Sequence, residues 1–403
     1  MSEVIIINIS GEDKPGLTAS ITDILAAHSV NILDIGQAVI HSTLSLGILI
    51  EIPKASESSP ILKDVLLCGH NLGVTVKFSP ISEENYNNWV NAHGKSRNIV
   101  TLLAKKITAK QISAISGIIA KNNLNIDKIT RLSGRISLGN DDESTNACVE
   151  FSFRGDAVNH ESMKNELLQT ASELDIDVAL QVDNVYRNNR RLVVFDMDST
   201  LIKIEVIDEL AAAANVGDQV SAITESAMKG EIDFSESFKQ RVKLLKGLDE
   251  KIVREIADQL PLTDGAEKLI QTLKHLNYTT AIISGGFTYF GETLKQKLGI
   301  DYVYANELEI VDGKVTGNVV GDIVDGQRKA KLLEEIANKE NISLKQVIAV
   351  GDGANDLPML GKAGLGIAYH AKPIVKENAE QAISTLGLDS ILYLIGYRDW
   401  YNT

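Results

Sequence analysis

The sequence predicts an α/β protein in which two ferredoxin-like α+β units precede a doubly wound, mostly parallel sheet with an inserted helical cap. Two observations support this fold class. The first half of the 403-residue chain repeats a strand–helix–strand–strand–helix–strand pattern, which is the order of a ferredoxin-like unit. The second half contains three short apolar runs separated by helical patterns, and each run ends in glycine or polar residues, as strands of an open parallel sheet often do.

The repeat in the first half needs no gap. Ile5 aligns with Ile99 and Asn31 with Asn125, a constant offset of 94 positions. We expect the elements of the first copy at 4–9, 17–27, 32–40, 46–52, 60–70 and 74–78, and those of the second at 99–104, 109–122, 126–132, 147–153, 161–173 and 177–181. Together with the second half, these assignments predict domains at 1–88, 97–185 and 190–403.

Each of the three expected strands in the second half leads into side chains suited to phosphate chemistry. Run 192–195 leads into Asp196 and Asp198, run 280–283 into the Ser-Gly-Gly tripeptide 284–286, and run 347–350 into the segment Gly-Asp-Gly-Ala-Asn-Asp at 351–356. Ligands of open α/β sheets bind outside the carboxyl ends of the strands. The three segments are therefore expected to converge on one phosphoryl-transfer site.

Lys329 lies between the second and third of these segments, on an otherwise apolar helical face. It stands three, four and seven positions before Leu332, Leu333 and Ile336. Taken singly, such a lysine most often extends to solvent, an Asp-x-Asp pair is most often a solvated turn or structural cation site, and Ser-Gly-Gly is most often a loop. The order of all four motifs along one chain favours a shared site.

The composition limits the classes of partner. A formal net charge of −14 disfavours nucleic acid and anionic membranes, because binding to either requires clustered basic residues. Cys68 and Cys148 are the only cysteines, too few for a disulfide framework, and favour a reducing compartment. Since the N-terminus does not resemble a secretory signal and no apolar stretch is long enough to span a bilayer, we expect a cytoplasmic protein.

Over its second half the chain resembles the haloacid dehalogenase-like hydrolases, specifically their phosphoserine phosphatase branch. The resemblance rests on the four motifs above, in that order. It implies that Asp196 attacks phosphorus to form an aspartyl-phosphate and that Asp198 serves as general acid and base. It also implies that Ser284, the Gly285 N–H and Lys329 bind the phosphate oxygens.

The same resemblance implies a Mg²⁺ cofactor. Mg²⁺ prefers hard oxygen ligands, and Asp196, Asp352 and the backbone carbonyl of Asp198 form a suitable set. Asp356 and Asn355 would hold the metal's surroundings or the phosphate from behind. An acidic chain that acts on an anionic substrate needs such a local positive charge.

The segment at about 205–262 shows helical patterning and is expected to form the cap. Phosphoserine presents an ammonium and a carboxylate besides its phosphate. The resemblance implies that Glu205 pairs with the ammonium, that Arg241 binds the carboxylate, and that Met228 and Phe234 close over the substrate. On the residues alone, Glu205 would be an acid at a helix start and Arg241 an edge residue whose stem covers apolar surface. Met228 and Phe234 would be core side chains.

The first copy of the repeat resembles an ACT domain. The mark of that family is a Lys-Pro-Gly turn between the first strand and the first helix, found here at 14–16 and missing from the second copy. The resemblance implies Asp13 and Asn31 as candidate contacts for an amino-acid effector such as serine. Asn125 recurs in the copy without the turn, so the asparagine is equally interpreted as architectural. ACT domains also often serve only to pair subunits, here as a homodimer.

Three functions remain open on the sequence. The leading hypothesis is a Mg²⁺-dependent phosphoserine phosphatase that hydrolyses O-phospho-L-serine to L-serine and phosphate, the last step of serine biosynthesis. The same aspartyl-phosphate would permit transfer of the phosphoryl group to another hydroxyl acceptor, such as homoserine. The third hypothesis is an amino-acid-sensing protein that only binds phosphorylated ligands; loss of Asp196, Lys329 or Asp352 would favour it, and all three are present.

Overall fold

The computed structural model describes residues 3–53, 57–92, 96–135, 146–155 and 160–402. The chain divides into two compact units, Met1–Lys95 and Ser96–Thr403. The first unit contains a four-stranded sheet, and the second contains another four-stranded sheet and a seven-stranded one. The three-domain boundaries expected from the sequence remain a prediction.

The first unit follows the element order expected from the repeat. Its elements are β1 (Glu3–Glu12), α1 (Leu17–Ala27), β2 (Asn31–Ile40), β3 (Thr43–Ile52), α2 (Ser58–Leu72), β4 (Thr75–Ile81) and α3 (Glu83–Ala92). The strands pair antiparallel in the order β2-β3-β1-β4. Ile5, Ile7 and Ile9 point to one face of the sheet, because successive side chains of a strand alternate, and they pack with α1 and α2.

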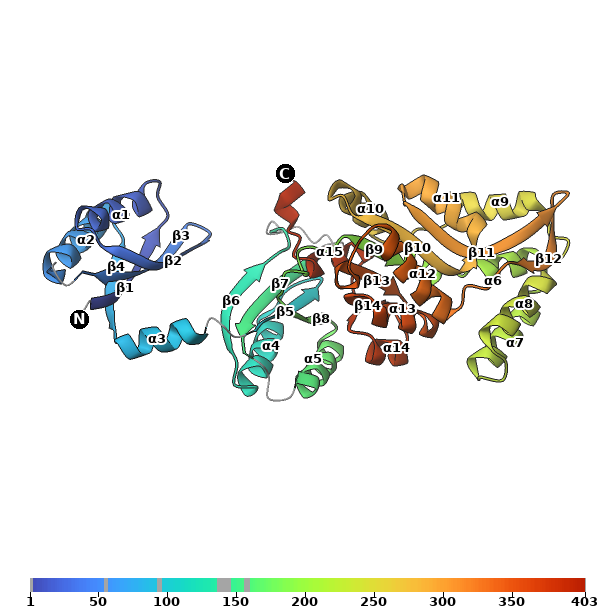
Figure 1. Ribbon diagram of the computed structural model, residues 1–403, viewed down its shortest axis with the longest axis horizontal. Coiled ribbons are helices and arrows are strands. Elements are labelled where there is room, and N and C mark those ends of the chain that lie inside the picture. Colours follow the sequence, from blue (N-terminus) through green and yellow to red (C-terminus); the bar gives the residue numbers. More distant parts are fainter. Residues whose placement is uncertain (1–2, 54–56, 93–95, 136–145, 156–159, 403) are drawn as a thin grey trace. The chain divides into compact units, whose positions relative to one another are not determined.

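Helix α3 has no counterpart among the elements predicted from the sequence. Tyr86, Trp89 and Val90 give it one short apolar stripe of helical spacing, and most of its other residues are polar. It lies on the side of the first sheet opposite to α1 and α2 (Figure 1). The face of the sheet that α1 and α2 leave open therefore has α3 as its neighbour.

The second unit begins with the second copy of the repeat. Its elements are β5 (Arg97–Ala104), α4 (Ala109–Lys121), β6 (Asn125–Arg131), β7 (Ala147–Arg154), α5 (His160–Leu174) and β8 (Asp177–Val182). The antiparallel order β6-β7-β5-β8 reproduces that of the first copy. The prediction of two ferredoxin-like units is confirmed. Helix α4 begins where the sequence indicated, because Thr108 and Gln111 form a capping box.

The seven-stranded sheet has the order β12-β11-β10-β9-β13-β14-β15 and is parallel except for the edge pair β11–β12. Its strands are β9 (Leu192–Phe195), β10 (Thr279–Phe287), β11 (Tyr302–Val311), β12 (Lys314–Val320), β13 (Val347–Gly351), β14 (Leu365–Tyr369) and β15 (Gln381–Ile383). The helices that follow the cap are α10 (Ala266–His275), α11 (Thr288–Leu298), α12 (Gly326–Lys339), α13 (Leu357–Lys362), α14 (Pro373–Asn378) and α15 (Ile391–Leu394).

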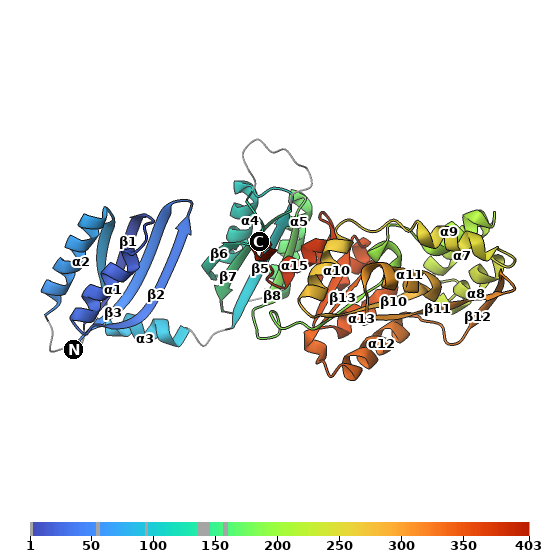
Figure 2. The same ribbon diagram turned by 90° about the horizontal axis from the view of Figure 1, so that it is seen from above.

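This sheet is buried on both faces, as the uninterrupted apolar run of β9 indicates. Val193 and Phe195 belong to a core cluster with residues of α10 and α11. Leu192 and Val194 point the other way, into a cluster with residues of α12 and α13. Helices thus cover both faces of the sheet (Figure 2), and the predicted doubly wound α/β fold is confirmed.

The predicted helical cap lies between β9 and β10. It consists of α6 (Val206–Ala213), α7 (Gly217–Met228), α8 (Phe234–Leu244) and α9 (Glu250–Asp258). The two connections to the sheet pair with each other: Ile202 forms an antiparallel bridge with Leu262, and the Lys203 N–H donates to the Pro261 carbonyl at 2.9 Å. The cap therefore leaves and rejoins the sheet through a short two-stranded stem.

The second ferredoxin-like sheet is fixed to the edge of the seven-stranded sheet. Asp177, at the start of β8 and only 4% exposed, accepts hydrogen bonds from the backbone N–H groups of Ser384 and Thr385 at 2.7 and 2.9 Å. The Gln381 side chain of β15 bonds both the N–H and the carbonyl of Leu180 in β8. The edges of the two sheets are thus joined by side chains that satisfy backbone groups.

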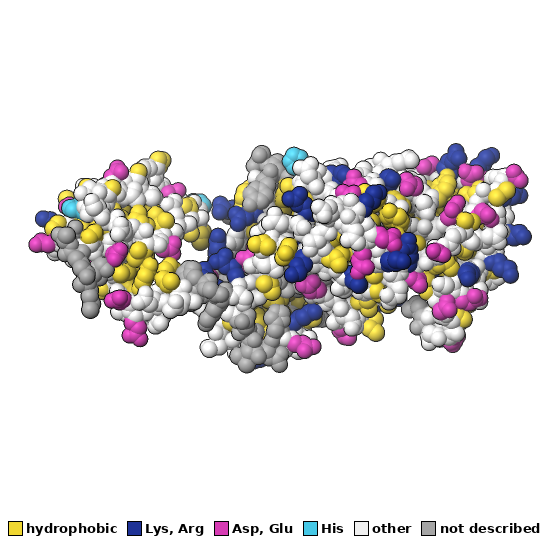
Figure 3. Space-filling view, viewed as in Figure 1, with side chains coloured by type: hydrophobic (Ala, Val, Ile, Leu, Met, Phe, Trp, Pro, Cys, Tyr) yellow, Lys and Arg dark blue, Asp and Glu magenta, His cyan; other side chains and the backbone are white. Residues whose placement is uncertain are grey.

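The surface carries mixed charges, with acidic and basic side chains interspersed over the second unit (Figure 3). The first unit exposes apolar side chains, among them Ile32, Ile35 and Ile40 of β2, the last of which is 78% exposed. Among the described residues, every helix is too short or too polar to traverse a lipid bilayer.

Candidate active site

The three motifs lie side by side at the carboxyl ends of neighbouring strands. Asp196 follows β9, the Ser-Gly-Gly tripeptide lies within the last part of β10, and Asp352 follows β13. β9 pairs in parallel with both β10 and β13, so all three strands end at the same edge of the sheet. Buried apolar residues of the strands fix this edge, while the polar residues after them remain available for chemistry.

Lys329 connects two of the carboxylates. Its side chain is fully buried, and its Nζ lies 2.9 Å from Asp196 Oδ1 and 2.7 Å from Asp356 Oδ1. Burial opposes the charged ammonium, but the attraction of Asp196 and Asp356 outweighs it and raises the pKa of Lys329 above its ordinary value. The sequence pattern placed this ammonium on an apolar face, and the structure shows that it points to the acids rather than to solvent.

Three carboxylates gather around that ammonium. Asp196, Asp352 and Asp356 each offer an oxygen, and these oxygens lie within 4.8 Å of one another. Burial, followed by repulsion from Asp196 and Asp356, raises the pKa of Asp352 to about 7. The single ammonium of Lys329 leaves negative charge in excess, and a hard divalent cation with oxygen ligands fits such a set. Asp196 and Asp352 come together as predicted.

Asp356 is held from two sides. One oxygen accepts from Lys329 and the other from the Gly353 N–H at 3.0 Å. Burial raises the pKa of Asp356, as does the nearby Asp196. Asn355 precedes it and packs its backbone carbonyl against the start of α12, since a Cβ placed on Gly326 would lie 2.7 Å from the Asn355 oxygen. The arrangement is compatible with the supporting role expected for both residues.

Asp198 lies in the turn between β9 and the cap. The Val206 N–H donates to its Oδ1 at 3.1 Å. Burial, and then the charges of Glu205 and Asp196, raise the pKa of Asp198 well above its ordinary value. A Cβ placed on Gly286 would lie 2.4 Å from Asp198 Oδ2, so this carboxylate reaches the Ser-Gly-Gly turn and requires glycine there. A carboxyl group that retains its proton at this position is suited to proton transfer.

Ser284 and Gly285 lie beneath a cap residue. Ser284 is 1% exposed, and its Oγ accepts from the Gly286 N–H at 2.9 Å. A Cβ on Gly285 would lie 3.0 Å from Cζ of Phe234, the first residue of α8. The Phe234 ring therefore covers the turn that is expected to bind phosphate. The Met228 side chain, predicted to close over the substrate with it, lies outside the described part of the chain.

Glu205 and Arg241 face the same region from the cap. Glu205 accepts a hydrogen bond from Ser199 Oγ at 2.7 Å. The residue is accessible to solvent, but partial desolvation by the surrounding protein raises the pKa of its carboxyl group. Burial lowers the pKa of Arg241, and the carboxylates of Asp208, Glu205 and Asp198 attract its guanidinium. Both predicted specificity residues are thus close enough to the acid cluster to share its electrostatic field.

Two residues beyond the predicted site residues also hold the site. Thr200 Oγ1 donates to Asp352 Oδ1 at 3.0 Å and joins the first motif to the last. Asn306, on β11 and 2% exposed, hydrogen-bonds both the Gly285 carbonyl and the Val324 N–H. The role of Thr200 could have been predicted, because it completes the pattern Asp-x-Asp-x-Thr. A single asparagine in a strand, such as Asn306, belongs to no pattern that would predict its role.

In the first unit, the two candidate effector residues each form a hydrogen bond within the unit. The Asp13 N–H donates to the Ser42 carbonyl at 2.8 Å, and the Asn31 side chain donates to Glu51 Oε2 at 3.3 Å. Gly16 precedes α1 with φ of 86°, a conformation that favours glycine. These contacts are compatible with either interpretation of the Lys-Pro-Gly turn.

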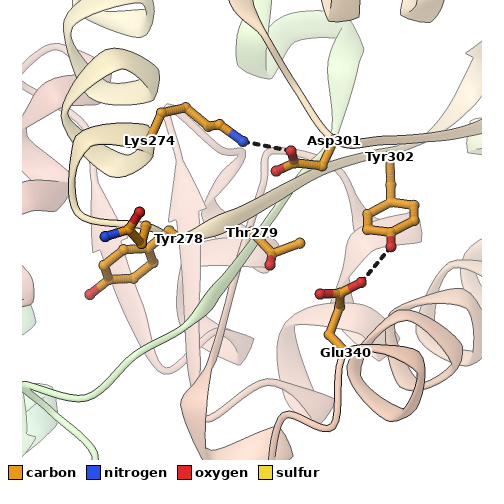
Figure 4. Close-up of a pocket in the computed structure, with 7 residues that line it drawn as sticks. Lys274, Tyr278, Thr279, Asp301, Tyr302 and Glu340 are labelled. Carbon is orange, nitrogen blue, oxygen red and sulfur yellow. Dashed lines mark hydrogen bonds and ion pairs between the residues drawn. The ribbon is translucent and has the colours of Figure 1, made fainter.

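A separate polar pocket of about 320 Å³ lies at the opposite ends of the strands, where β10 and β11 begin (Figure 4). Lys274 Nζ is 2.5 Å from Asp301, and the Tyr302 hydroxyl donates to Glu340. These groups already pair with one another, and they lie at the wrong end of the sheet for the chemistry above. We do not assign catalysis to this pocket.

The fold and the acid cluster define a haloacid dehalogenase-like hydrolase, and the model of that family matches residues 190–364. The model of the ACT domain matches residues 3–79. A phosphoserine phosphatase of Streptomyces coelicolor is 40% identical over 97% of this chain and 92% of its own length. A phosphoserine phosphatase of Mycobacterium tuberculosis is 39% identical over 97% and 93%. The chain therefore belongs to the phosphoserine phosphatase family of the haloacid dehalogenase-like hydrolases.

Solved structures agree with this assignment. A haloacid dehalogenase family hydrolase from Salmonella enterica serovar Typhi superposes with a TM-score of 0.64 and is 31% identical, covering 74% of this chain and 98% of its own. A probable phosphoserine phosphatase from Vibrio cholerae, without ligand, gives a TM-score of 0.59 at 33% identity over 75% of this chain and 87% of its own.

Proposed function

We propose that this chain hydrolyses O-phospho-L-serine to L-serine and phosphate through an aspartyl-phosphate on Asp196, with Mg²⁺ as cofactor, as the last step of serine biosynthesis. The observation that carries the proposal is the buried Asp196 carboxylate, 2.9 Å from the buried Lys329 ammonium and within an acid cluster at the carboxyl ends of three strands. The two relatives that match over nearly their whole length are phosphoserine phosphatases, which supports the substrate.

In the first half of the reaction, an Asp196 oxygen attacks phosphorus and the bond from phosphorus to the serine oxygen breaks. Asp198 gives its proton to that leaving oxygen, for which its raised pKa is suited. Ser284, the Gly285 N–H and the Lys329 ammonium hydrogen-bond the phosphoryl oxygens as their charge shifts. The products of this half are serine and the aspartyl-phosphate.

In the second half, Asp198 takes a proton from water, the water oxygen attacks phosphorus, and the bond from phosphorus to Asp196 breaks. Phosphate leaves and both carboxyl groups return to their starting states. Asp196, Asp352 and the Asp198 backbone carbonyl would hold Mg²⁺, with Asp356 and Asn355 behind them. Once bound, this cation supplies positive charge that lets an anionic nucleophile approach an anionic phosphate.

Substrate choice is assigned to the cap. The Glu205 carboxylate would bind the ammonium of phosphoserine and the Arg241 guanidinium its carboxylate, with Phe234 and Met228 closing over them. Phe234 lies against Gly285, and this contact supports a closing role for the cap. Each charge of the substrate then meets an opposite charge outside the phosphate position.

The test compares three phosphomonoesters by phosphate release: phosphoserine, O-phosphoethanolamine, which lacks the carboxylate, and 3-phosphoglycerate, which lacks the ammonium. We expect a preference for phosphoserine and a requirement for Mg²⁺. Arg241→Ala should lower kcat/KM for phosphoserine by about 10- to 100-fold while affecting phosphoethanolamine much less. Glu205→Gln should likewise lower kcat/KM for phosphoserine while affecting 3-phosphoglycerate, which lacks the ammonium, much less. Lys243→Ala and Glu209→Gln, exposed positions on the same cap helices, are the controls.

Two outcomes would contradict parts of this proposal. Equal rates on the three esters would remove the substrate assignment, and turnover by Asp196→Asn would remove the covalent mechanism. Serine and phosphate released in equal amounts when homoserine is present would support water as acceptor, whereas phosphorylated homoserine would show a phosphotransferase.

For the ACT part we propose a cytoplasmic homodimer whose first unit binds L-serine near Asp13 and Asn31. The matching ACT model and the Lys-Pro-Gly turn support this. Because serine is also the product, calorimetry with L-serine is compared in Arg241→Ala and Asp13→Ala forms of the full chain. Heat lost only with Asp13→Ala supports an effector site, and light scattering measures the dimer.

A further inference from the structure

A hollow lies on the open face of the first sheet, beneath α3. It has a volume of about 430 Å³, within the range of about 300 to 1,000 Å³ that small-molecule sites occupy. Ten residues of β1, β2, β3, β4 and α3 line it. Residues of the Lys-Pro-Gly turn are not among them, so the hollow is distinct from the effector position proposed above.

The floor of the hollow is formed by two glycines that face each other. Gly36 of β2 and Gly47 of β3 are directly paired in the sheet. A Cβ placed on Gly36 would meet no atom within 4 Å, and one on Gly47 would meet only the Gly36 carbonyl oxygen at 4.0 Å. Because both side chains are missing at one pair, the sheet surface is recessed beside Ile6 and Leu49, which pair with each other on β1 and β3. A flat group can therefore reach the backbone there.

The roof of the hollow is aromatic. Tyr86 and Trp89 lie three residues apart on α3, and their ring centroids are 6.0 Å apart. Aromatic rings bury large apolar areas, and their faces attract cations. Trp89 is 40% exposed, so a ligand can reach the ring from solvent.

The polar lining has one sign of charge. Asp34 is the only ionisable acid among the ten lining residues, and no lysine, arginine or histidine accompanies it. Its Oδ1 accepts from the Ile35 N–H at 2.9 Å, which orients the carboxylate at the edge of the recess. Asn85 on α3 supplies an amide that can donate or accept. A carboxylate beside an apolar recess attracts a cationic group and repels an anionic one.

We propose that this hollow is a binding site for a small organic cation, with an aromatic or branched apolar body between the glycine floor and the rings of α3 and an ammonium group at Asp34. The size of the hollow, its aromatic roof and its single negative charge define this class. The proposal is independent of the catalytic assignment, since all lining residues belong to the first unit.

The sequence offers a spectroscopic reporter for the test. The chain has two tryptophans, so Trp400→Phe leaves Trp89 as the only one in the full-length protein. Its emission is followed while three probes of similar shape are titrated: 2-phenylethylammonium, neutral 2-phenylethanol and anionic 3-phenylpropionate. We expect saturable binding of the ammonium, weaker binding of the alcohol and none of the anion. Asp34→Asn should weaken binding of the ammonium by about fivefold and leave the alcohol unchanged.

A filled recess is the second arm. Gly36→Leu should abolish the response to all probes, because its side chain enters the empty space above the pair. Gly117→Leu, at another glycine whose Cβ would meet no atom within 4 Å, is the control. Equal affinity for the three probes, or unchanged binding in Gly36→Leu that retains its circular dichroism, would overturn the proposal. A change in Trp89 emission that follows protein concentration alone would also overturn it, since a second copy would then cover the hollow.

Discussion

The side-chain amide of Asn306 donates to the carbonyl of Gly285 at 2.8 Å, and the same side chain accepts from the Val324 N–H at 2.8 Å. Gly285 belongs to the turn expected to bind phosphate. Val324 lies two residues before α12, the helix that carries Lys329. One buried amide thus joins two separate segments of the chain that carry groups proposed to bind phosphate.

We expect Asn306→Asp to reduce kcat/KM by about 10- to 100-fold. The carboxylate has nearly the same shape but cannot donate to the Gly285 carbonyl, and an unsatisfied buried group costs about 1 to 3 kcal/mol. Kinetics and urea unfolding are measured together. Asn338→Asp, at an exposed position of α12, is the control and should leave kcat/KM unchanged. An Asn306→Asp enzyme with normal kinetics and only a lower unfolding midpoint would limit Asn306 to a structural role.

The buried Lys329 ammonium compensates charge that would otherwise destabilise the fold. Lys329→Met should lower the free energy of unfolding by about 3 to 5 kcal/mol, because Asp196 and Asp356 lose their buried partner, and should abolish turnover. Lys331→Met, on the exposed side of the same helix, should change neither quantity.

A second substitution separates the two effects. Adding Asp356→Leu to Lys329→Met removes one uncompensated carboxylate and should restore part of the stability, but no activity. Chemical denaturation and phosphate release give the two readouts. Recovery of turnover in the double variant would show that Lys329 acts only by balancing charge and has no part in binding phosphate.

The convergence of Asp196, Ser284 and Asp352 could be predicted from the sequence because each follows an apolar run, and parallel strands end at one edge. The two ferredoxin-like units of the first half could be predicted because Asn31 and Asn125 recur in register. The apolar pattern placed their helices close to the observed starts. These features could be predicted because they depend on short stretches of sequence: hydrophobic periodicity, turn glycines and apolar runs.

The roles of Asn306 and Asp177 could not be predicted in this way. Asn306 on β11 bonds Gly285 on the neighbouring strand β10. Which strand lies next to β11 is decided by the whole sheet and not by the residues around Asn306. The partners of Asp177 lie 207 and 208 positions further along the chain. Helix α3 was not predicted because its apolar stripe is short: Tyr86, Trp89 and Val90 stand among mostly polar residues.

The acid cluster predicts how the affinity for Mg²⁺ depends on pH. With the pKa of Asp352 raised to about 7, this carboxyl is largely protonated at pH 6 in the metal-free protein and ionised at pH 8. A metal ligand must be deprotonated, so the apparent affinity should fall by up to about tenfold per pH unit below 7 and level off above it. Calorimetry at pH 6 and 8, in buffers of different ionisation enthalpy, would detect the released proton.

Removal of the metal provides the control for that titration. A chelator should abolish turnover, and added Mg²⁺ should restore it and raise the unfolding temperature by relieving repulsion in the cluster. Asp352→Asn should lose most of this stabilisation. The same Mg²⁺ affinity at pH 6 and pH 8 would show that Asp352 does not change its protonation on binding the metal. An equal rise in unfolding temperature for Asp352→Asn and the unmodified enzyme would show that Asp352 is not a metal ligand.

The raised pKa of Asp198 predicts a dependence on the leaving group. Burial, Glu205 and Asp196 all favour its protonated form, so the acid needed to protonate the serine oxygen persists to higher pH than for an ordinary aspartate. Turnover of phosphoserine should fall as the pH rises through that pKa. Asp198→Asn should reduce the rate on phosphoserine by about 100-fold or more, because its alkoxide requires a proton to leave.

A substrate with a good leaving group tests that reasoning directly. With p-nitrophenyl phosphate, whose phenolate leaves without a proton, Asp198→Asn should still give a burst of nitrophenolate as Asp196 becomes phosphorylated. Steady-state turnover should then be slow, since the base for the water step is missing. Glu209→Gln, an exposed acid on the first cap helix, should behave like the unmodified enzyme on both substrates. Equal losses on both substrates, with no burst, would show that Asp198 does not act as the acid of the first step.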